Sequence, residues 1–320
     1  SAMTFATRVF GSILPCCMAV MFFSAPCLAR PLVLVPPGPL ILATIGASID
    51  GRIGISVWKT QEEAVTKLVT GDAAAVVLPV TVGAALARKA DIVLLGAFRE
   101  NVFALVARDS VADGGWADLR GKEILVAQGR GTVLDSILRS VLPAYGLKPG
   151  RDVSLVYAPA PEVAALYRQK RASLVALPEP FASLALEFGG RVLDPQEAWA
   201  RLTGSSARFP VGGVFALRSR IAADRQELSL VVSAFAESTA WFAKHPEEAC
   251  DLAGKTFGIP AERFAKALPQ IHIAFDPADA CSADVAALLA RLHDALSPDM
   301  PPPPDLSLYR PDSAANPATR

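Results

Sequence analysis

Apolar runs alternate with segments of helical periodicity through residues 32–96. Two of the runs, Ala73–Leu78 and Ile92–Leu95, are apolar throughout, which is typical of strands buried on both faces of a sheet. Thr60 followed by Glu63 has the pattern of a capping box and predicts that a helix begins there. Alternating segments of this length favour parallel sheets covered by helices on both faces. In chain order the segments are Leu32–Pro36, Leu40–Ile49, Arg52–Trp58, Glu62–Val69, Ala73–Pro79, Val82–Lys89 and Asp91–Gly96.

A longer extended stretch interrupts this alternation. Asn101–Ala107 is strand-like and continues away from the first sheet, so we expect the chain to cross to a second domain within Arg99–Asp118. Arg208–Arg218 is again strand-like and is broken by two consecutive glycines, and we expect the return crossover there. From Ile221 to Leu296 the periodicity is helical, with breaks near prolines and glycine.

The alternation resumes in residues 118–180 with a fixed order of strands, turns and helices. Each strand in it is short and apolar, and each is followed by a turn and a helical pattern. The order is Glu123–Ala127, the turn Gln128-Gly129-Arg130-Gly131-Thr132, a helical pattern to Tyr145, Ser154–Ala158, a helix opening at Pro161, and Ser173–Leu177 followed by Pro178-Glu179-Pro180.

This order resembles the nitrate/sulfonate/taurine-type solute-binding proteins of bacterial ABC transporters. Phe209–Val214 looks like the returning hinge strand of that family, and Leu32–Pro39 looks like its first strand and ligand loop. The resemblance covers residues 31–300 and implies an α/β, two-lobed periplasmic-binding-protein type 2 fold. Each lobe would be a mostly parallel sheet flanked by helices, and a two-segment hinge would join the lobes.

The resemblance also implies a domain plan and a function. Residues 31–105 and 214–300 would form lobe 1, and residues 106–213 would form lobe 2. The protein would capture a small organic anion or zwitterion between the lobes and deliver it to an ABC permease in the inner membrane. Sulfonates, carboxylates and heterocycles all remain open as ligands, and we expect a monomer without a cofactor or metal.

The N-terminus has the pattern of a secretory signal peptide. Arg8 precedes the apolar stretch Val9–Phe23, and small residues lead to Ala29. The stretch is short for a membrane span, which needs roughly 20 residues. We therefore expect export to the periplasm with cleavage near Ala29, so that residues 1–29 are a signal peptide, and residues 1–2 read as an expression scar before Met3. A lipid anchor on Cys27 and an uncleaved membrane anchor are the alternatives.

Cys250 and Cys281 are the cysteines that remain after cleavage. In an oxidising compartment they could form a disulfide, and the alternative is two buried thiols that pack as small apolar groups. Residues 301–320 are rich in proline and alanine and predict a flexible tail. Within it, Leu306, Leu308 and Tyr309 are the candidates for docking on the body of the protein.

Composition narrows the function further. The 320 residues include 52% hydrophobic residues, enough for a substantial core, and 31 basic residues balance 31 acidic ones. This balance gives no basic field for nucleic acid. The three histidines lie far apart and no hydrolase or metalloprotease motif occurs, so we do not expect an enzyme.

The turn Gln128-Gly129-Arg130-Gly131-Thr132 is the first candidate for ligand contact. It follows a strand and opens a helix, where free N–H groups, the helix dipole and a guanidinium favour carboxylate, sulfonate or phosphate oxygens. The alternative is purely structural: Thr132 with Asp135 would cap the helix and the glycines would make the turn.

In lobe 1 the equivalent candidates are the turns that follow two strands. Pro36, Gly38 and Pro39 follow the first strand, with an exposed Gly38 N–H as the expected contact. Pro79 and Thr81 follow the third strand, with the Thr81 hydroxyl as the polar group and helix capping as the alternative.

The crossovers supply the remaining candidates. Arg99 and Asn101 flank Glu100 at the first crossover, where the alternative for Arg99 is a hinge salt bridge with Glu100. Glu179 either orients a ligand amine or ring N–H, or serves as a structural cap. The return strand offers Phe209 for stacking, with core burial as the alternative, together with the bare backbone of Gly212 and the neighbouring charge of Arg208.

Two other functions remain open from the sequence. A periplasmic ligand sensor would use the same clamp, and a pyrimidine-synthesis-like enzyme would share the fold. The expected signal peptide argues against the enzyme, because such enzymes stay in the cytoplasm.

Overall fold

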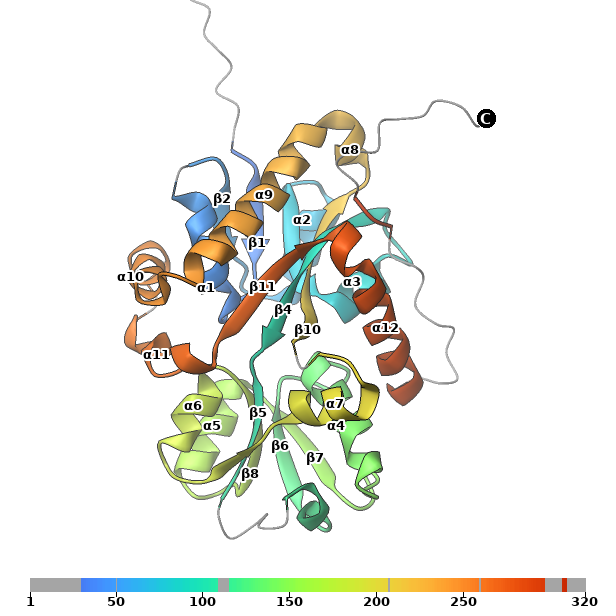
Figure 1. The fold of residues 1–320 in the computed structure, drawn as a ribbon, viewed down its shortest axis with the longest axis vertical. Helices are drawn as coiled ribbons and strands as arrows, with labels where there is room; N and C mark the ends of the chain where they lie inside the picture. The colour runs from blue at the N-terminus through green and yellow to red at the C-terminus, as the bar shows by residue number, and fades with distance from the viewer. Residues whose placement is uncertain are drawn as a thin grey trace, which may run out of the picture.

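Two separate β-sheets, each with its own helices, form the upper and lower bodies of the protein (Figure 1). This computed structural model describes residues 30–49, 51–108, 115–206, 208–258, 260–296 and 307–309. The expected signal peptide and Leu306 lie outside the described residues. No helix within the described part is both long and apolar enough to cross a membrane.

The first sheet has six strands in the order β11-β4-β10-β3-β1-β2. The strand β1 runs parallel to β2 and β3, whereas β10 lies antiparallel between β3 and β4, and β11 is antiparallel to β4. Parallel pairing is therefore confined to the part of the sheet built first along the chain. The bounds are β1 Leu32–Val35, β2 Gly54–Val57, β3 Ala75–Pro79, β4 Ile92–Asn101, β10 Phe209–Leu217 and β11 His272–Pro277.

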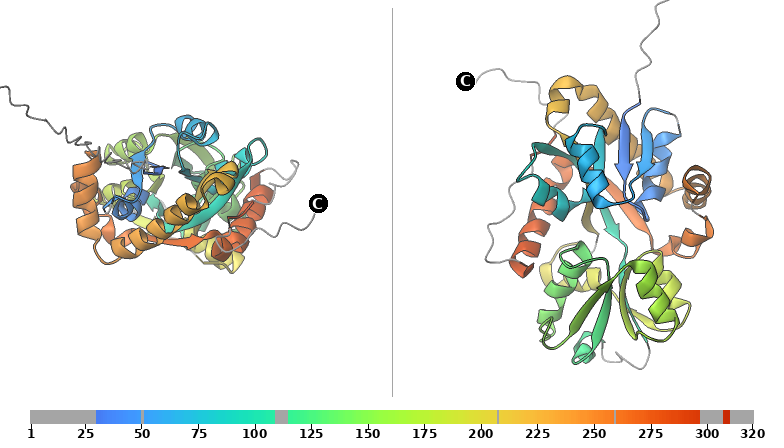
Figure 2. Two further views of the ribbon diagram at one scale, coloured as in Figure 1. Left: turned by 90° about the horizontal axis from the view of Figure 1, so that it is seen from above. Right: turned by 180° about the vertical axis from the view of Figure 1, so that it is seen from behind.

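Helices bury both faces of this sheet (Figure 2). One face packs Val33, Val77 and Val214 against α1, α9 and α10, and the other face packs Leu34 and Phe215 against α2, α3 and α12. The helices of this body are α1 Leu40–Thr44, η1 Ile45–Ser48, α2 Gln61–Val69, α3 Val80–Leu86, α8 Ser219–Ala223, α9 Arg225–Phe242, α10 Pro246–Phe257, α11 Glu262–Ala265, η3 Leu268–Gln270 and α12 Ala278–Leu296.

The second sheet has five strands in the order β7-β6-β8-β5-β9. The strand β6 is parallel to β7 and β8, and β5 is antiparallel to β8 and β9. Both sheets are thus mixed, with antiparallel strands where the chain crosses between bodies. The elements are β5 Phe103–Ala107, η2 Gly115–Leu119, β6 Glu123–Ala127, α4 Val133–Ala144, β7 Ser154–Ala158, α5 Ala160–Arg168, β8 Leu174–Pro178, α6 Phe181–Leu186, β9 Arg191–Leu193 and α7 Pro195–Thr203.

The first crossover is confined to one residue. The strand β4 ends at Asn101 in the first sheet, and β5 begins at Phe103 in the second, so Val102 alone separates them. The return lies between the end of α7 and the start of β10 at Phe209. Both changes of sheet therefore occur a few residues before the lobe boundaries expected at 105/106 and 213/214.

A buried glutamine holds the first crossover. The Gln196 side chain is fully buried, and its Oε1 accepts hydrogen bonds from the N–H groups of Val102 at 2.9 Å and Phe103 at 3.0 Å. Its Nε2 donates to the Glu100 carbonyl at 2.7 Å. Gln196 lies on α7 and thus ties the helices of the second body to the strand that arrives from the first.

The sequence pattern missed two strands. Residues 272–277 lie inside the segment expected to be helical, but they form β11 at the edge of the first sheet. Its exposed and buried positions alternate at His272, Ile273, Ala274 and Phe275, a short period-two signal between two long helices. The three-residue β9 is too short to give any period at all. The predicted start of α2 is confirmed, because Thr60 Oγ1 accepts from the Glu63 N–H at 3.1 Å.

Part of the expected flexible tail is docked. Leu94 N–H donates to the Ser307 carbonyl at 2.8 Å, and Tyr309 N–H donates to the Leu94 carbonyl at 2.9 Å, so that Leu308 forms a parallel bridge beside β4. Tyr309 is buried, and its hydroxyl donates to the Arg225 carbonyl at 3.0 Å. These three residues fasten α9 to β4, so the docking predicted for Leu308 and Tyr309 is confirmed.

Both cysteines from the body of the chain are free and buried in different places. Cys250 lies on α10 in the cluster against one face of the first sheet, and Cys281 lies on α12 in the cluster against the other face. The structure therefore has the two-thiol arrangement and not the disulfide. Burial raises the pKa of each thiol to about 11.

Replacing Gln196 by leucine should destabilise the protein. The change leaves two buried N–H groups and one buried carbonyl without their partner, at a cost of about 1–3 kcal/mol for each unsatisfied group. We expect the midpoint of urea unfolding to fall by an amount that corresponds to several kcal/mol. Gln169→Leu, on an exposed residue at the end of α5, is the matched control, and equal effects of both variants would contradict a special role for Gln196.

The two thiols should be inert in the folded protein. In a chain that starts at Arg30, we expect no reaction with Ellman's reagent near neutral pH, because only the exposed thiolate is nucleophilic. Unfolding in concentrated guanidinium chloride should release both thiols. Rapid labelling of either cysteine under native conditions would show that its burial is transient.

Candidate ligand-binding site

The predicted turns of the first sheet lie at the carboxyl ends of β1 and β3. Gly38 has φ +148°, a conformation that favours glycine, and an added Cβ there would touch nothing within 4 Å. Pro36 is half-buried and Pro39 is buried at the start of α1. The backbone at Gly38 is therefore approachable by a small molecule.

The turn after β3 exposes a free hydroxyl. Pro79 is the cap residue of α3 and makes no side-chain capping bond. Thr81 is half-buried in the first turn of the helix, and its hydroxyl has no hydrogen-bond partner among the described residues. The capping alternative for Thr81 is thus wrong, and its hydroxyl is available.

The turn Gln128–Thr132 opens α4 on the second sheet. Gln128 and Gly131 have positive φ angles, +71° and +83°, which turn the backbone sharply between strand and helix. Arg130 is exposed and has no partner among the described residues. The predicted Thr132 cap is not formed: the Thr132 hydroxyl donates to the Gly129 carbonyl at 2.8 Å.

A buried carboxylate, predicted only as part of a helix cap, fixes this turn. Asp135 is fully buried, and its Oδ2 accepts from the Gly131 N–H at 2.8 Å. Its Oδ1 accepts from Arg139 Nε at 2.9 Å and from the Tyr157 hydroxyl at 2.6 Å. Burial, and then the hydrogen bond to Asp135, raise the pKa of Tyr157. The spacing of Asp135 and Arg139 could have suggested the ion pair, but Tyr157 comes from another strand.

Neighbouring residues at the end of β4 point to opposite faces of the first sheet. Arg99 forms ion pairs with Asp276 on β11 and Asp284 on α12, so the alternative of a salt bridge with Glu100 is wrong. The Glu100 carboxyl instead lies next to Gly212, on the side of the sheet where Leu40 and Val77 also approach that glycine. In an extended strand successive side chains alternate between faces, which explains why Arg99 and Glu100 do not meet.

Three predicted residues surround a cavity on the α12 side of the crossover. Arg99, Arg208 and Phe209 line a volume of about 250 Å³ together with Trp199 and Asp284. Phe209 is buried, with its ring centroid 6.1 Å from that of Trp199, so core packing is the correct alternative for it. Asn101 is half-buried and lies opposite His272 of β11.

Gly212 lies in the middle of a sheet ladder. It pairs with Pro79 on one side and with Phe98 on the other, so its backbone is not bare as expected. An added Cβ would lie 3.0 Å from Leu40 Cδ1 and 3.4 Å from Glu100 Oε1. Gly212 thus permits close packing of Leu40 and the Glu100 carboxyl against β10.

Glu179 is buried and acts as a cap. Its carboxylate accepts from the Ser183 N–H at 3.1 Å and from the Ser183 hydroxyl at 3.0 Å at the start of α6. Its own N–H donates to the Val102 carbonyl at 2.7 Å, which places it directly beside the crossover. Burial raises the pKa of Glu179.

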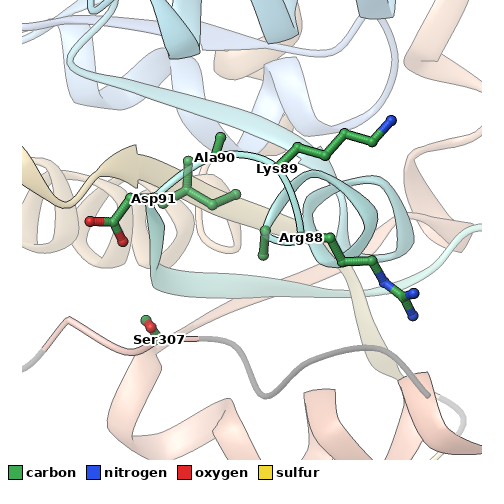
Figure 3. A pocket seen from close by; sticks show the side chains of 7 residues that line it. Arg88, Lys89, Ala90, Asp91 and Ser307 are labelled. Carbon is green, nitrogen blue, oxygen red and sulfur yellow. The ribbon is translucent and has the colours of Figure 1, made fainter. Parts of the chain in front are cut away.

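The predicted residues therefore fall into three groups. Pro36–Pro39, Pro79–Thr81 and Gly212 gather with Glu100 at one end of the first sheet; Gln128–Thr132 and Glu179 belong to the second body; Arg99, Arg208 and Phe209 lie on the α12 side. A further pocket of about 300 Å³, lined by Arg88, Lys89 and Asp91 (Figure 3), lies at the opposite end of β4 beside Ser307. No group of three or more potential metal ligands occurs in the described part of the chain.

Comparison with known proteins decides the family. The family model of the NMT1-like family matches residues 50–255. The chain belongs to the NMT1-like family. No curated protein is similar to it by sequence.

Solved structures share the fold of this NMT1-like protein. The periplasmic aliphatic sulphonate-binding protein SsuA of Escherichia coli is 21% identical, with a TM-score of 0.70 over 87% of this chain and 95% of that one. An ABC transporter structure from Parabacteroides distasonis is 19% identical, with a TM-score of 0.72 over 88% and 99%. The alkanesulfonate-binding SsuA of Xanthomonas axonopodis, bound to MOPS, is 17% identical, with a TM-score of 0.63 over 84% and 93%. The predicted two-lobed binding-protein fold and the resemblance to the sulfonate/nitrate-type family are thereby confirmed.

Replacing Glu100 by glutamine should change how stability depends on pH. Burial raises the pKa of Glu100 from 4.5 to about 8, so between these values the folded state binds more protons than the unfolded state. The contribution of Glu100 to the free energy of unfolding must therefore fall as pH rises through this window, by up to about 1.4 kcal/mol per pH unit.

The Glu100→Gln variant lacks this titration, so its stability relative to the unchanged protein should grow from pH 4.5 to 8 and level off above. Urea unfolding at a series of pH values measures the difference. Glu237→Gln, on an exposed residue of α9, is the control. A constant difference across the window would mean that the pKa of Glu100 is not raised in the folded protein.

Proposed function

We propose that this NMT1-like protein is the extracytoplasmic solute-binding component of an ABC importer and captures a small organic anion or zwitterion between its lobes. The observation that carries the proposal is Arg130. It lies on the turn that begins α4 in a two-lobed fold, and its exposed side chain has no hydrogen-bond or ion-pair partner among the described residues. The family match and the likeness to sulfonate-binding structures support it. The NrtA nitrate-binding protein of Synechocystis, 16% identical with a TM-score of 0.54, has a related shape.

The second lobe offers the anion a preformed receptor. The first N–H groups of an α-helix have no acceptor within the helix, and α4 has twelve residues to build a dipole. The Asp135 carboxylate accepts a hydrogen bond from the Gly131 N–H, and this bond fixes the turn. Arg130 adds a full positive charge that can bind a sulfonate or carboxylate.

The first lobe would close over the bound solute. The Gly38 carbonyl accepts from the Ile41 N–H at 3.1 Å, whereas the Gly38 N–H and the Thr81 hydroxyl have no hydrogen-bond partner among the described residues at these strand ends. A ligand that contacts both lobes stabilises the closed arrangement, and the closed arrangement is what a permease would recognise. The single-residue crossover at Val102 and the return before β10 would be the hinge.

The remaining parts of the proposal concern the protein's surroundings. Residues 1–29 would direct export to the periplasm and be removed, and the mature protein would act as a monomer that docks on an inner-membrane permease. Lobe 1 would consist of residues 31–101 and 209–300, and lobe 2 of residues 103–204. The role would be binding and delivery, with no chemical change of the solute.

Native mass spectrometry of gently purified protein tests the function. A small molecule bound at one copy per chain, and identified after denaturation, would establish the ligand class. If the protein is bare, a thermal-shift series with nitrate, alkanesulfonates and carboxylates follows, because a ligand that binds only the folded state raises the melting temperature. No bound molecule and no shift with any compound would refute the proposal.

Arg130→Ala should weaken anion binding without unfolding the protein. The exposed side chain makes no contact that the fold needs, and loss of a charge-assisted hydrogen bond should raise Kd by about tenfold or more. Titration calorimetry with the anion that gives the largest thermal shift measures this. Arg168→Ala, on an exposed residue at the end of α5, should leave Kd unchanged. Equal affinities of both variants would remove Arg130 from the site.

A further inference from the structure

Glu100 is a buried acid without a partner. Only 4% of it is exposed, and its side chain makes no hydrogen bond or ion pair with any described residue. Buried charges are normally paired. An unpartnered carboxyl at the end of β4, beside the strand-end turns of the first lobe, therefore needs an explanation.

The residues that lie with the Glu100 carboxyl around Gly212 of the strand β10 are apolar. Leu40 comes from α1, Val77 from β3 and Gly212 from β10. Its ladder neighbours are Phe209 on β10 and Ile273 on β11. Arg99 points to the other face and is engaged by two aspartates. No basic or titratable side chain of these elements faces the carboxyl.

The carboxyl oxygens are not sealed from solvent. The described side-chain polar atoms that are both fully enclosed and without a hydrogen bond belong to Arg108 and Arg191, and none belongs to Glu100. Gly212 lies beside Oε1: a Cβ there would stand 3.4 Å from it and would press on Leu40 at 3.0 Å, so a larger residue at this position would crowd the carboxyl.

We propose that Glu100 is a specificity-determining residue that accepts a protonated amine of the solute, which makes the solute a zwitterion and not a simple anion. This inference rests on the proposed function and names the solute class. The amine would supply to the Glu100 carboxyl the hydrogen-bond donor and the positive charge that the protein itself does not supply. Arg130 and the start of α4 would take the anionic end.

Binding of an ammonium group should then release a proton from the protein. Burial raises the pKa of Glu100 to about 8, so near neutral pH the empty site holds a largely protonated carboxyl. Pairing with an ammonium group favours the carboxylate form. A residue with only a structural role would produce no such proton release.

Matched pairs of compounds test the inference. Taurine and ethanesulfonate differ only in the ammonium group, as do β-alanine and propionate. Each is titrated calorimetrically near neutral pH, in two buffers of different ionisation enthalpy, into the unchanged protein, Glu100→Gln, Gly212→Ala and the control Glu237→Gln. The comparison of buffers counts the protons released.

We expect the unchanged protein and the control to prefer the ammonium-bearing member of a pair by about tenfold or more, with close to one proton released. Glu100→Gln should lose both the preference and the proton release. Gly212→Ala should weaken binding of the ammonium-bearing member while keeping the carboxyl.

Several results would overturn the inference. Equal or tighter binding of ethanesulfonate or propionate by the unchanged protein would refute it and leave the proposed function standing. Preference for the amine that persists in Glu100→Gln would move the amine site elsewhere. If none of the four compounds binds, the inference is refuted, and the thermal-shift series with other anions decides the proposed function separately.

Discussion

Hydrogen bonding at Val102 is the constraint on which the two-body arrangement depends. A strand that leaves one sheet and enters another has, at the change, backbone groups that neither ladder can pair. Here the Glu100 carbonyl and the N–H groups of Val102 and Phe103 are buried, and Gln196 satisfies all three. Because unpaired buried groups would cost several kcal/mol, α7 must stay beside the crossover whatever the rest of the second body does.

This anchoring gives two chemically different sides to a single strand. Arg99 and Glu100 are adjacent in sequence but lie on opposite faces of β4. On the α12 side, acidic residues of β11 and α12 neutralise Arg99. On the α1 side, the surroundings of Glu100 are apolar. Arg99 is thus paired within the protein, whereas under our proposal Glu100 is paired by the bound solute.

Local patterns predicted much of the fold, and long-range contacts account for most of what they missed. Strands such as Ala75–Pro79 and the cap at Thr60 are encoded by neighbouring residues. The strand β11 depends on pairing with β4, far away in the chain, and the docking of Tyr309 depends on α9. The turn Gln128–Thr132 was found as a turn, but its support by Tyr157, and the loss of Arg99 and Phe209 to ion pairing and packing, require the assembled structure.

Under the proposed function, the two lobes present different charges to the solute because their buried carboxyl groups are paired differently. The second lobe satisfies the buried Asp135 with a guanidinium, a hydroxyl and a backbone N–H, and the charge of Arg130 beside it has no partner among the described residues. The first lobe leaves its acid unpaired at Glu100. A simple anion would satisfy the second lobe and leave the first lobe's carboxyl as an uncompensated cost, whereas a zwitterion satisfies both. The charge pattern therefore favours a ligand with opposite charges at its two ends.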